Sequence, residues 1–146
     1  MLPFLIEMPR LYQLFVAEWL KAHLPNEFFL KSLERISTGK EGVRFEIDLV
    51  LYDAKGNALC VLDTKYKRVL TQNDVNQIRT YAGVKQCYYA VLVYPESLQR
   101  HLNTFLCRVK VQSLIFSLEG DFENTGEIFM NELLRNLPLE HQQLTN

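Results

Sequence analysis

The sequence predicts an α/β domain built around a mixed sheet. Two patterns carry this prediction: residues 43–66 alternate like an antiparallel hairpin, and residues 59–94 follow the strand, helix, strand order of a parallel crossover. The chain has 146 residues, of which 48% are hydrophobic. A chain of this length buries about two-thirds of its unfolded surface in one core. We therefore expect a single domain over residues 1–146, with a polar tail from about residue 138.

The first predicted element is an amphipathic helix over residues 11–23. Its apolar residues recur at helical spacing and form one broad side, which holds Leu11, Leu14, Phe15, Trp19 and Leu20. Packing in the core explains these large side chains without a ligand.

A hairpin follows, with strands at 43–51 and 59–66 and a turn at 53–57. Each strand has one apolar face: Phe45, Ile47, Leu49 and Leu51 in the first, and Cys60, Leu62, Thr64 and Tyr66 in the second. The faces coincide when Leu49 lies opposite Leu62, which sets Asp48 opposite Asp63 on the other face. Directly opposed Cβ atoms are roughly 4.5–5.5 Å apart, so both carboxylates can reach one cation.

The rest of the chain continues the alternation of helices and strands. A helix over residues 73–85, with Asn73 as its N-cap, precedes an apolar run at 87–94 that Pro95 ends. Such a run is typical of a buried central strand. We then expect a helix at 97–107, a strand at 109–118 and a terminal helix at 127–137.

Asp63-Thr64-Lys65, with Asp48 upstream, is the pattern with the most chemical content. Two carboxylates can hold a divalent cation while an ammonium group polarises the attacking water, which suits metal-assisted cleavage of a phosphodiester bond. Without a metal, two facing carboxylates repel each other and cost stability. The alternative is a solvated strand face, on which Lys65 pairs only with Asp63 or Glu46.

Four stretches between Phe4 and Tyr94 have the order and spacing of a known family. They are residues 4–12 (FLIEMPRLY) ahead of a helix, 47–51 (IDLVL), 61–67 (VLDTKYK), and 74–82 with Gln77 and Tyr81. Together they resemble the nuclease domain of McrC-type subunits of 5-methylcytosine restriction systems, within the PD-(D/E)XK nuclease superfamily. The resemblance implies a three-layer α/β/α domain of restriction-endonuclease type that hydrolyses phosphodiester bonds in DNA.

The same resemblance implies a role for each matching residue. Asp48 and Asp63 would be ligands of Mg²⁺ or Mn²⁺, with the main-chain carbonyl of Thr64 as a third ligand. Lys65 would be the catalytic lysine. Gln77 would line the site from a helix, and Tyr81, one turn further on, would share its face.

The sequence departs from the family pattern at several points. Ile47 stands where a proline usually precedes the first Asp, and Gln13 stands where the first helix usually has a Glu. An amide is a weaker cation ligand than a carboxylate. Glu18 cannot replace that Glu, since five residues turn a helix by about 140°. We also expect the chain to lack the N-terminal region through which such subunits meet a GTPase partner. A GTPase partner subunit or a homodimer is the assembly that the resemblance implies.

Composition sets further limits. The net charge of −1 argues against a strongly basic nucleic-acid-binding domain, although cations cluster at Lys65, Lys67 and Arg68 and continue to Arg79 and Lys85. A cluster of this size is otherwise typical of a solvated surface. No apolar run approaches the roughly 20 residues of a membrane helix and no secretory signal is present, so we expect a cytoplasmic protein. Three separated cysteines indicate buried, reduced thiols: Cys60, Cys87 and Cys107.

Other chemistries match the sequence less well. The stretch 37–41 contains Gly39-Lys40, but Glu34 and Glu41 replace the first Gly and the Ser/Thr of a P-loop, so we interpret it as a loop. His23, His101 and His141 lack ligand spacing. The main alternative to a nuclease is a catalytically inactive nuclease-fold module that binds DNA or a protein partner, which Gln13 and the charge favour. A structural subunit of a larger complex is a third possibility.

Overall fold

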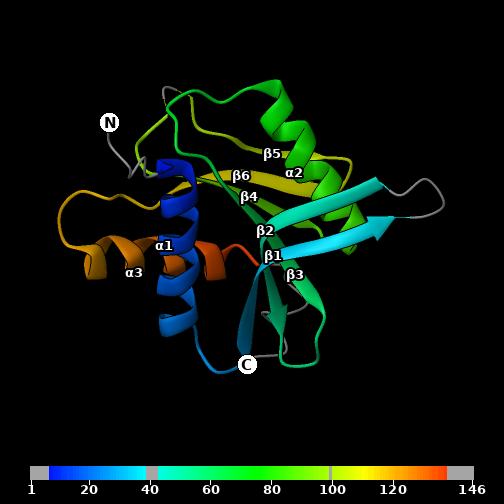
Figure 1. The fold of residues 1–146 in the computed structure, drawn as a ribbon, viewed down its shortest axis with the longest axis horizontal. Coiled ribbons are helices and arrows are strands. Elements are labelled where there is room, and N and C mark those ends of the chain that lie inside the picture. Colours follow the sequence, from blue (N-terminus) through cyan, green and yellow to red (C-terminus); the bar gives the residue numbers. More distant parts are fainter. Residues whose placement is uncertain (1–6, 39–42, 99, 138–146) are drawn as a thin grey trace, which may run out of the picture.

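The computed structural model describes residues 7–38, 43–98 and 100–137. Within them runs of three consecutive strands lie between successive helices (Figure 1). In chain order the elements are α1 (Met8–His23), β1 (Phe28–Thr38), β2 (Val43–Asp53), β3 (Ala58–Thr64), α2 (Gln72–Lys85), β4 (Tyr89–Tyr94), β5 (Asn103–Leu106), β6 (Val109–Ile115) and α3 (Phe122–Arg135).

The strands form one mixed sheet in the order β1-β2-β3-β4-β6-β5. Its first three strands are antiparallel neighbours, β3, β4 and β6 run parallel, and β5 returns antiparallel to β6. Helices α1 and α3 cover one face and α2 covers the other, so the domain has three layers (Figure 1). The predicted α/β fold with a mixed central sheet is confirmed, including the β3–α2–β4 crossover.

Each helix is fixed by a short local signal. Pro9 opens α1, where the missing N–H costs nothing, and α1 buries a stripe that includes Tyr12, Val16 and Leu20. Helix α2 begins at a capping box, in which Thr71 accepts a hydrogen bond from the Asp74 N–H and Asp74 accepts one from Thr71. The cap is therefore Thr71, and the prediction of Asn73 was wrong by two residues.

The predicted helix at 97–107 is wrong. This segment contains the edge strand β5, and Cys107 and Arg108 form a turn with φ of 50° and 73° that leads into β6. Leu98, Leu102 and Leu106 are spaced by four, which fits both a helix and a strand, and all three pack on the α2 side. Cys107 is exposed rather than buried, whereas Cys60 and Cys87 are buried free thiols.

Other boundaries also differ from the prediction. Strand β1 was not predicted, and α3 begins at Phe122, behind the N-cap Asp121, rather than at residue 127. Ser37 and Thr38, expected in a loop, end β1, while residues 39–41 of that expected loop lie outside the described residues. The polar tail from residue 138, with His141, also lies outside them.

Strand β2 changes the face that it buries at Asp48. Leu49 and Leu51 pack toward α1 and α3, as predicted, but Ile47 and Phe45 pack on the α2 side. Across the β1–β2 ladder, Leu33 lies between the paired positions that flank Asp48 and has a φ of 54°. A positive φ is an outlier for a bulky residue, so the hairpin of β1 and β2 kinks at this point. Asp48 therefore lies between Leu49, which packs on the α1 side of the sheet, and Ile47, which packs on the α2 side.

Candidate active site

The hairpin register places the two predicted carboxylates side by side. Leu49 pairs with Leu62 and Val50 with Val61 across β2 and β3, as predicted. Asp48 and Asp63 lie one step beyond this ladder, and their carboxyl groups are close enough to share a hydrogen bond. The predicted register and the closeness of these two carboxyl groups are therefore confirmed, although Asp48 lies at the change of face in β2 rather than in a regular alternation.

Asp63 is a buried carboxylate, and only 4% of the residue is exposed. Burial and, after it, the neighbouring Asp48 raise its pKa to about 7, although Lys65 acts to lower it. Its Oδ2 atom lies 2.7 Å from Lys65 Nζ but accepts no well-directed hydrogen bond from any described residue. The contact is thus an ion pair that leaves acceptor capacity on a buried oxygen.

Asp48 is held by the strand opposite. Its Oδ2 atom accepts hydrogen bonds from the main-chain N–H and from the side-chain hydroxyl of Thr64, both at 3.1 Å. These two contacts fix the carboxylate against the end of β3. Thr64 therefore orients Asp48 through its side chain, a role that its place in the sequence did not indicate.

Lys65 connects β3 to α2. Its Nζ atom contacts Asp63, donates a hydrogen bond to Gln77 Oε1 at 3.0 Å and lies 3.7 Å from Asp74. Burial lowers the pKa of Lys65, but the surrounding carboxylates outweigh burial and the net pKa is raised. Lys65 is therefore a charged donor at neutral pH. Glu46 instead contacts Arg35, so the solvated pairing of Glu46 with Lys65 does not form.

Helix α2 supplies Gln77 and Tyr81. Gln77 accepts from Lys65 and donates from Nε2 to the Tyr81 hydroxyl at 2.9 Å. The two residues are one turn apart and share a face, as predicted. Their placement orients the ammonium group of Lys65 toward Asp63.

Gln13 approaches Asp48 from the other side of the sheet. Together with Asp48, Thr64 and the first turn of α1, it lines a cleft of about 630 Å³. Gln13 is 5% exposed, and its Nε2 atom has no hydrogen-bond partner in the described part of the chain. Glu18 is exposed and pairs with Lys21, so it does not take the place of a carboxylate at position 13.

The basic cluster after β3 is already paired. Lys67 contacts Asp74 at 2.7 Å and Arg68 contacts Glu96 at 2.6 Å. On α2, Arg79 contacts the Cys107 sulfur and Lys85 pairs with Glu34. These cations therefore do not form the open phosphate-binding patch that their clustering in the sequence suggests.

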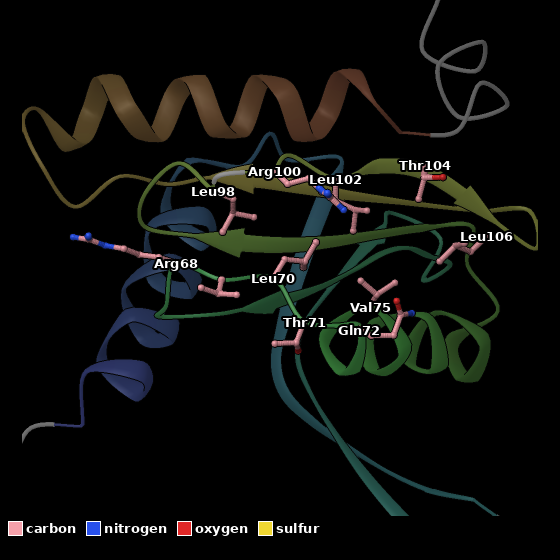
Figure 2. Close-up of a pocket in the computed structure, with 11 residues that line it drawn as sticks. Arg68, Leu70, Thr71, Gln72, Val75, Leu98, Arg100, Leu102, Thr104 and Leu106 are labelled. Carbon is pink, nitrogen blue, oxygen red and sulfur yellow. The ribbon is translucent and has the colours of Figure 1, made fainter.

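A second cavity, of about 650 Å³, begins at Arg68 and runs between the start of α2 and β5. Leu70, Val75, Leu98 and Leu102 line its apolar part, while Arg68 points outward at one end (Figure 2). No carboxylate lines it. It contains none of the residues predicted for the site.

The oxygen ligands that Asp48 and Asp63 offer fit a hard divalent cation. Two carboxylates converge there, and one buried carboxylate oxygen lacks a hydrogen bond. Oxygen ligands of this kind suit Mg²⁺. Among the described residues no group of three or more His, Cys, Asp or Glu residues could hold a metal, so further ligands would have to be other oxygen atoms, such as those of carbonyl groups, side-chain amides or water.

Asp74 belongs to this region but was not predicted as part of it. It is buried and contacts both Lys65 and Lys67 while it caps α2. Burial raises its pKa, but hydrogen bonds from Lys67 and Thr71 outweigh burial and lower it. The spacing of Thr71 and Asp74 is that of a capping box, which is the signal that could have revealed it.

The fold and the site together define an α/β domain with two carboxylates and one lysine at the end of a central strand. Residues 1–95 match the family model described as McrBC 5-methylcytosine restriction system component, and the chain belongs to this family. No curated protein matches the chain. In the described ranges, no helix is long and apolar enough to cross a membrane.

Proposed function

We propose that the protein is a Mg²⁺-dependent deoxyribonuclease of PD-(D/E)XK type that hydrolyses phosphodiester bonds within a 5-methylcytosine restriction system. One observation carries the proposal: Asp48 and the buried Asp63 converge, Lys65 lies 2.7 Å from Asp63, and an Asp63 oxygen lacks a hydrogen bond. Membership of the restriction-system family supports DNA as the substrate.

Asp48 and Asp63, with the main-chain carbonyl of Thr64, would hold Mg²⁺ or Mn²⁺. A cation bound there lowers the pKa of bound water and neutralises charge on the phosphate. Thr64 keeps the Asp48 carboxylate in place through its two hydrogen bonds. A bound cation would also remove the repulsion that two adjacent carboxylates otherwise suffer.

Lys65 would bind the attacking water or a phosphate oxygen as a charged donor. Its raised pKa keeps the ammonium group protonated at neutral pH, so it stabilises negative charge and does not act as a base. Gln77, itself held by Tyr81, restricts the direction of this ammonium group. Gln77 and Tyr81 thus position Lys65, and Lys65 acts on the reacting atoms.

Cleavage of plasmid DNA with Mg²⁺ or Mn²⁺ tests the proposal. Lys65→Ala should abolish cutting but retain Mn²⁺ binding by calorimetry, because Lys65 is not a ligand. Asp63→Asn should lose both. Lys55→Ala, which removes an exposed cation in the turn of the same hairpin, should cut like the wild type. Equal cutting by wild type and Lys65→Ala would indicate a contaminating nuclease.

A second candidate function is a catalytically inactive module that binds DNA or a protein partner. It is favoured by the amide of Gln13 in the cleft, where a carboxylate would bind a cation better, and by the pairing of Lys67 and Arg68 with carboxylates. The absence of both Mn²⁺ binding and cleavage in the wild type would support it. In either case the resemblance implies a GTPase partner subunit or a homodimer. Size-exclusion chromatography with light scattering would show whether the protein alone forms a homodimer.

A further inference from the structure

The two edge strands of the sheet differ in how they are protected from pairing with another chain. Strand β1 carries charged side chains at Lys31, Glu34 and Arg35, and Leu33 interrupts it with a positive φ. Charges and kinks are features by which edge strands avoid such pairing. Strand β5 has the sequence NTFL, without charge or proline, and pairs with β6 in a continuous register. In the described part of the sheet β6 is its one neighbour, so β5 is open to an added strand.

Every second residue of β5 turns its main-chain groups away from β6. The Ser113 N–H donates to the Leu102 carbonyl at 2.8 Å, which fixes the phase of the antiparallel ladder. Thr104 is in phase with Leu102 and bonds to β6, whereas the N–H and C=O groups of Asn103 and Phe105 face outward. The Phe105 side chain is also 69% exposed. This edge therefore offers main-chain donors and acceptors to a strand that lies beside it.

An apolar groove follows the α2 side of the same edge. It is the cavity of about 650 Å³ described above, and Leu102, Thr104 and Leu106 line it from the β5 segment (Figure 2). Leu70 and Val75 line it from the other side, ahead of α2 and in its first turn. Alternate side chains of a strand point to one face of a sheet, so those of an added strand can reach this groove. Because β5 is short, such contacts must add to the main-chain bonds.

This edge also carries uncompensated positive charge. Residues 97–118 contain no Asp or Glu, although the whole chain has a net charge of −1. Arg100 precedes β5 and Arg108 follows it, and both are exposed and form no ion pair within the described residues. Arg68, at the end of the groove, is already paired. On the opposite face of β5, the cavity of about 470 Å³ against α3 has one carboxylate in its lining, that of Glu132.

A second copy of the chain fits this edge poorly. Twofold antiparallel pairing of β5 about Thr104 would set Arg100 of one copy opposite Arg108 of the other, since both lie equally far from Thr104. Like charges that are directly opposed destabilise a sheet. An acidic strand would meet the same two cations favourably, so the charge favours a partner of different sequence.

We infer that β5 is a docking edge for an extended peptide segment of another protein, with apolar side chains on one face and acidic side chains near both ends. The segment adds to the sheet through main-chain hydrogen bonds to Asn103 and Phe105. Its apolar side chains lie in the groove, and its carboxylates pair with Arg100 and Arg108. This inference is independent of the nuclease proposal, because no residue of the edge belongs to the candidate active site.

Fluorescence anisotropy with a labelled peptide, acetyl-Glu-Leu-Thr-Val-Thr-Leu-Glu-amide, tests the inference on the full chain. A control peptide with Lys in place of both Glu residues should bind about tenfold more weakly, because attraction to the arginines becomes repulsion. Arg100→Ala and Arg108→Ala should each weaken binding of the acidic peptide about threefold. Lys55→Ala, which removes an exposed cation in the turn between β2 and β3, should bind it like the wild type.

A pair of variants at Phe105 tests the main-chain pairing separately. Phe105→Pro removes an outward N–H without removing a bond to β6, and edge strands tolerate proline at such positions. Phe105→Val also loses the ring but keeps the N–H, so it should bind the acidic peptide about fivefold more tightly than Phe105→Pro. Thermal unfolding shows whether each variant is folded.

Amide hydrogen exchange of the wild type, followed by NMR, gives a readout that needs no variant. The amides of Asn103 and Phe105 should exchange rapidly in the free protein and slowly when the acidic peptide is bound. The Thr104 amide, which already bonds to β6, should exchange slowly in both states. Unchanged exchange at Asn103 and Phe105 overturns the inference, as does a failure of the acidic peptide to bind better than the basic one.

The other occupants of this edge give different results. If Arg100→Ala weakens binding of a DNA duplex to Lys65→Ala protein but leaves peptide binding unchanged, the edge is a nucleic-acid surface and the inference is wrong. Dimerisation that Phe105→Pro abolishes would assign the edge to a second copy. DNA cleavage is scored separately: a nuclease that does not bind the peptide loses only the docking edge, and an inactive protein that binds it loses only the nuclease proposal.

Discussion

Asp63 combines burial with proximity to a second carboxylate, and both disfavour its charged form. At the scale of single residues, the pairing of Asp48 with Asp63 could be predicted because strand alternation is regular from Leu49 onward. The kink at Asp48 could not be predicted, since it depends on a positive φ at Leu33, and leucine gives no sequence signal for that conformation. The open amide of Gln13 also depends on tertiary packing that no local pattern encodes.

Asp63→Asn should stabilise the metal-free protein increasingly as pH rises. The pKa of Asp63 is raised from 3.8 to about 7 on folding, so between these values the folded state binds more protons than the unfolded state. Stability of the wild type therefore falls as pH rises through this window, by up to roughly 1.4 kcal/mol per pH unit. The asparagine does not titrate and escapes this loss.

Urea unfolding in EDTA at pH 5 and at pH 7.5 measures this effect. The difference in unfolding free energy between Asp63→Asn and wild type should be larger at the higher pH. Glu18→Gln, at an exposed surface position, is the control. A difference that stays constant with pH would contradict the account of Asp63.

At the scale of elements, strong and unambiguous patterns were predicted correctly. The buried run of β4 and the presence of helix α1 follow from the sequence pattern, because each satisfies only one period. The predicted buried side of α1 was only partly right, since Trp19 and Leu20 are buried but Leu11 and Leu14 are exposed. The segment 97–107 was mistaken because a spacing of four satisfies both helix and strand. Strand β1 was not predicted. It lies at the edge of the described sheet, with β2 as its one neighbour. Its side chains are mostly exposed or half-buried, and Leu33 interrupts the strand pattern with a positive φ.

The two helical glycines should respond oppositely to alanine. A methyl group at Gly83 of α2 meets nothing within 4 Å, so Gly83→Ala should gain stability by about 0.5–1 kcal/mol from helix propensity. A methyl group at Gly126 of α3 would overlap the Trp19 indole. That indole is stacked on His23 and packed edge-on against Phe116, so it has little room to move.

Gly126→Ala should therefore destabilise the protein, by about 1–3 kcal/mol from overpacking, despite the better helix propensity. Thermal or urea unfolding of both variants against wild type measures the contrast. A gain in stability at both positions would show that α1 and α3 are packed less tightly than the structure indicates.

At the scale of the whole molecule, the family match ends one residue after β4, and the later strands β5 and β6 complete the sheet. Strand β4 pairs with β6 along the full length of β4. The Tyr12 hydroxyl donates a hydrogen bond of 2.9 Å to the carbonyl of Phe116. Phe116, Phe129 and Leu133 also belong to the core under α1. The single-domain expectation is consistent with these contacts, because the first and last helices share one core.

A fragment of residues 1–95 should not fold by itself. Without β6 the fully buried strand β4 becomes an open edge, and the core under α1 loses several of its largest side chains. Circular dichroism and amide proton dispersion should show an unfolded or aggregated chain. A chain ending at residue 137 keeps every described element and is the folded control. Cooperative unfolding of the 1–95 fragment would contradict this prediction.

The contact between Thr64 and Asp48 spans only 16 positions of the chain. Closing so short a loop costs little entropy, so one hairpin can bring the two acidic side chains together before the slower parallel pairings form. All residues assigned to the candidate active site lie before residue 96. Evolutionary change in the last third of the chain can therefore alter the stability of the protein and its contacts with other molecules, while the hairpin that carries Asp48 and Asp63 keeps its local geometry.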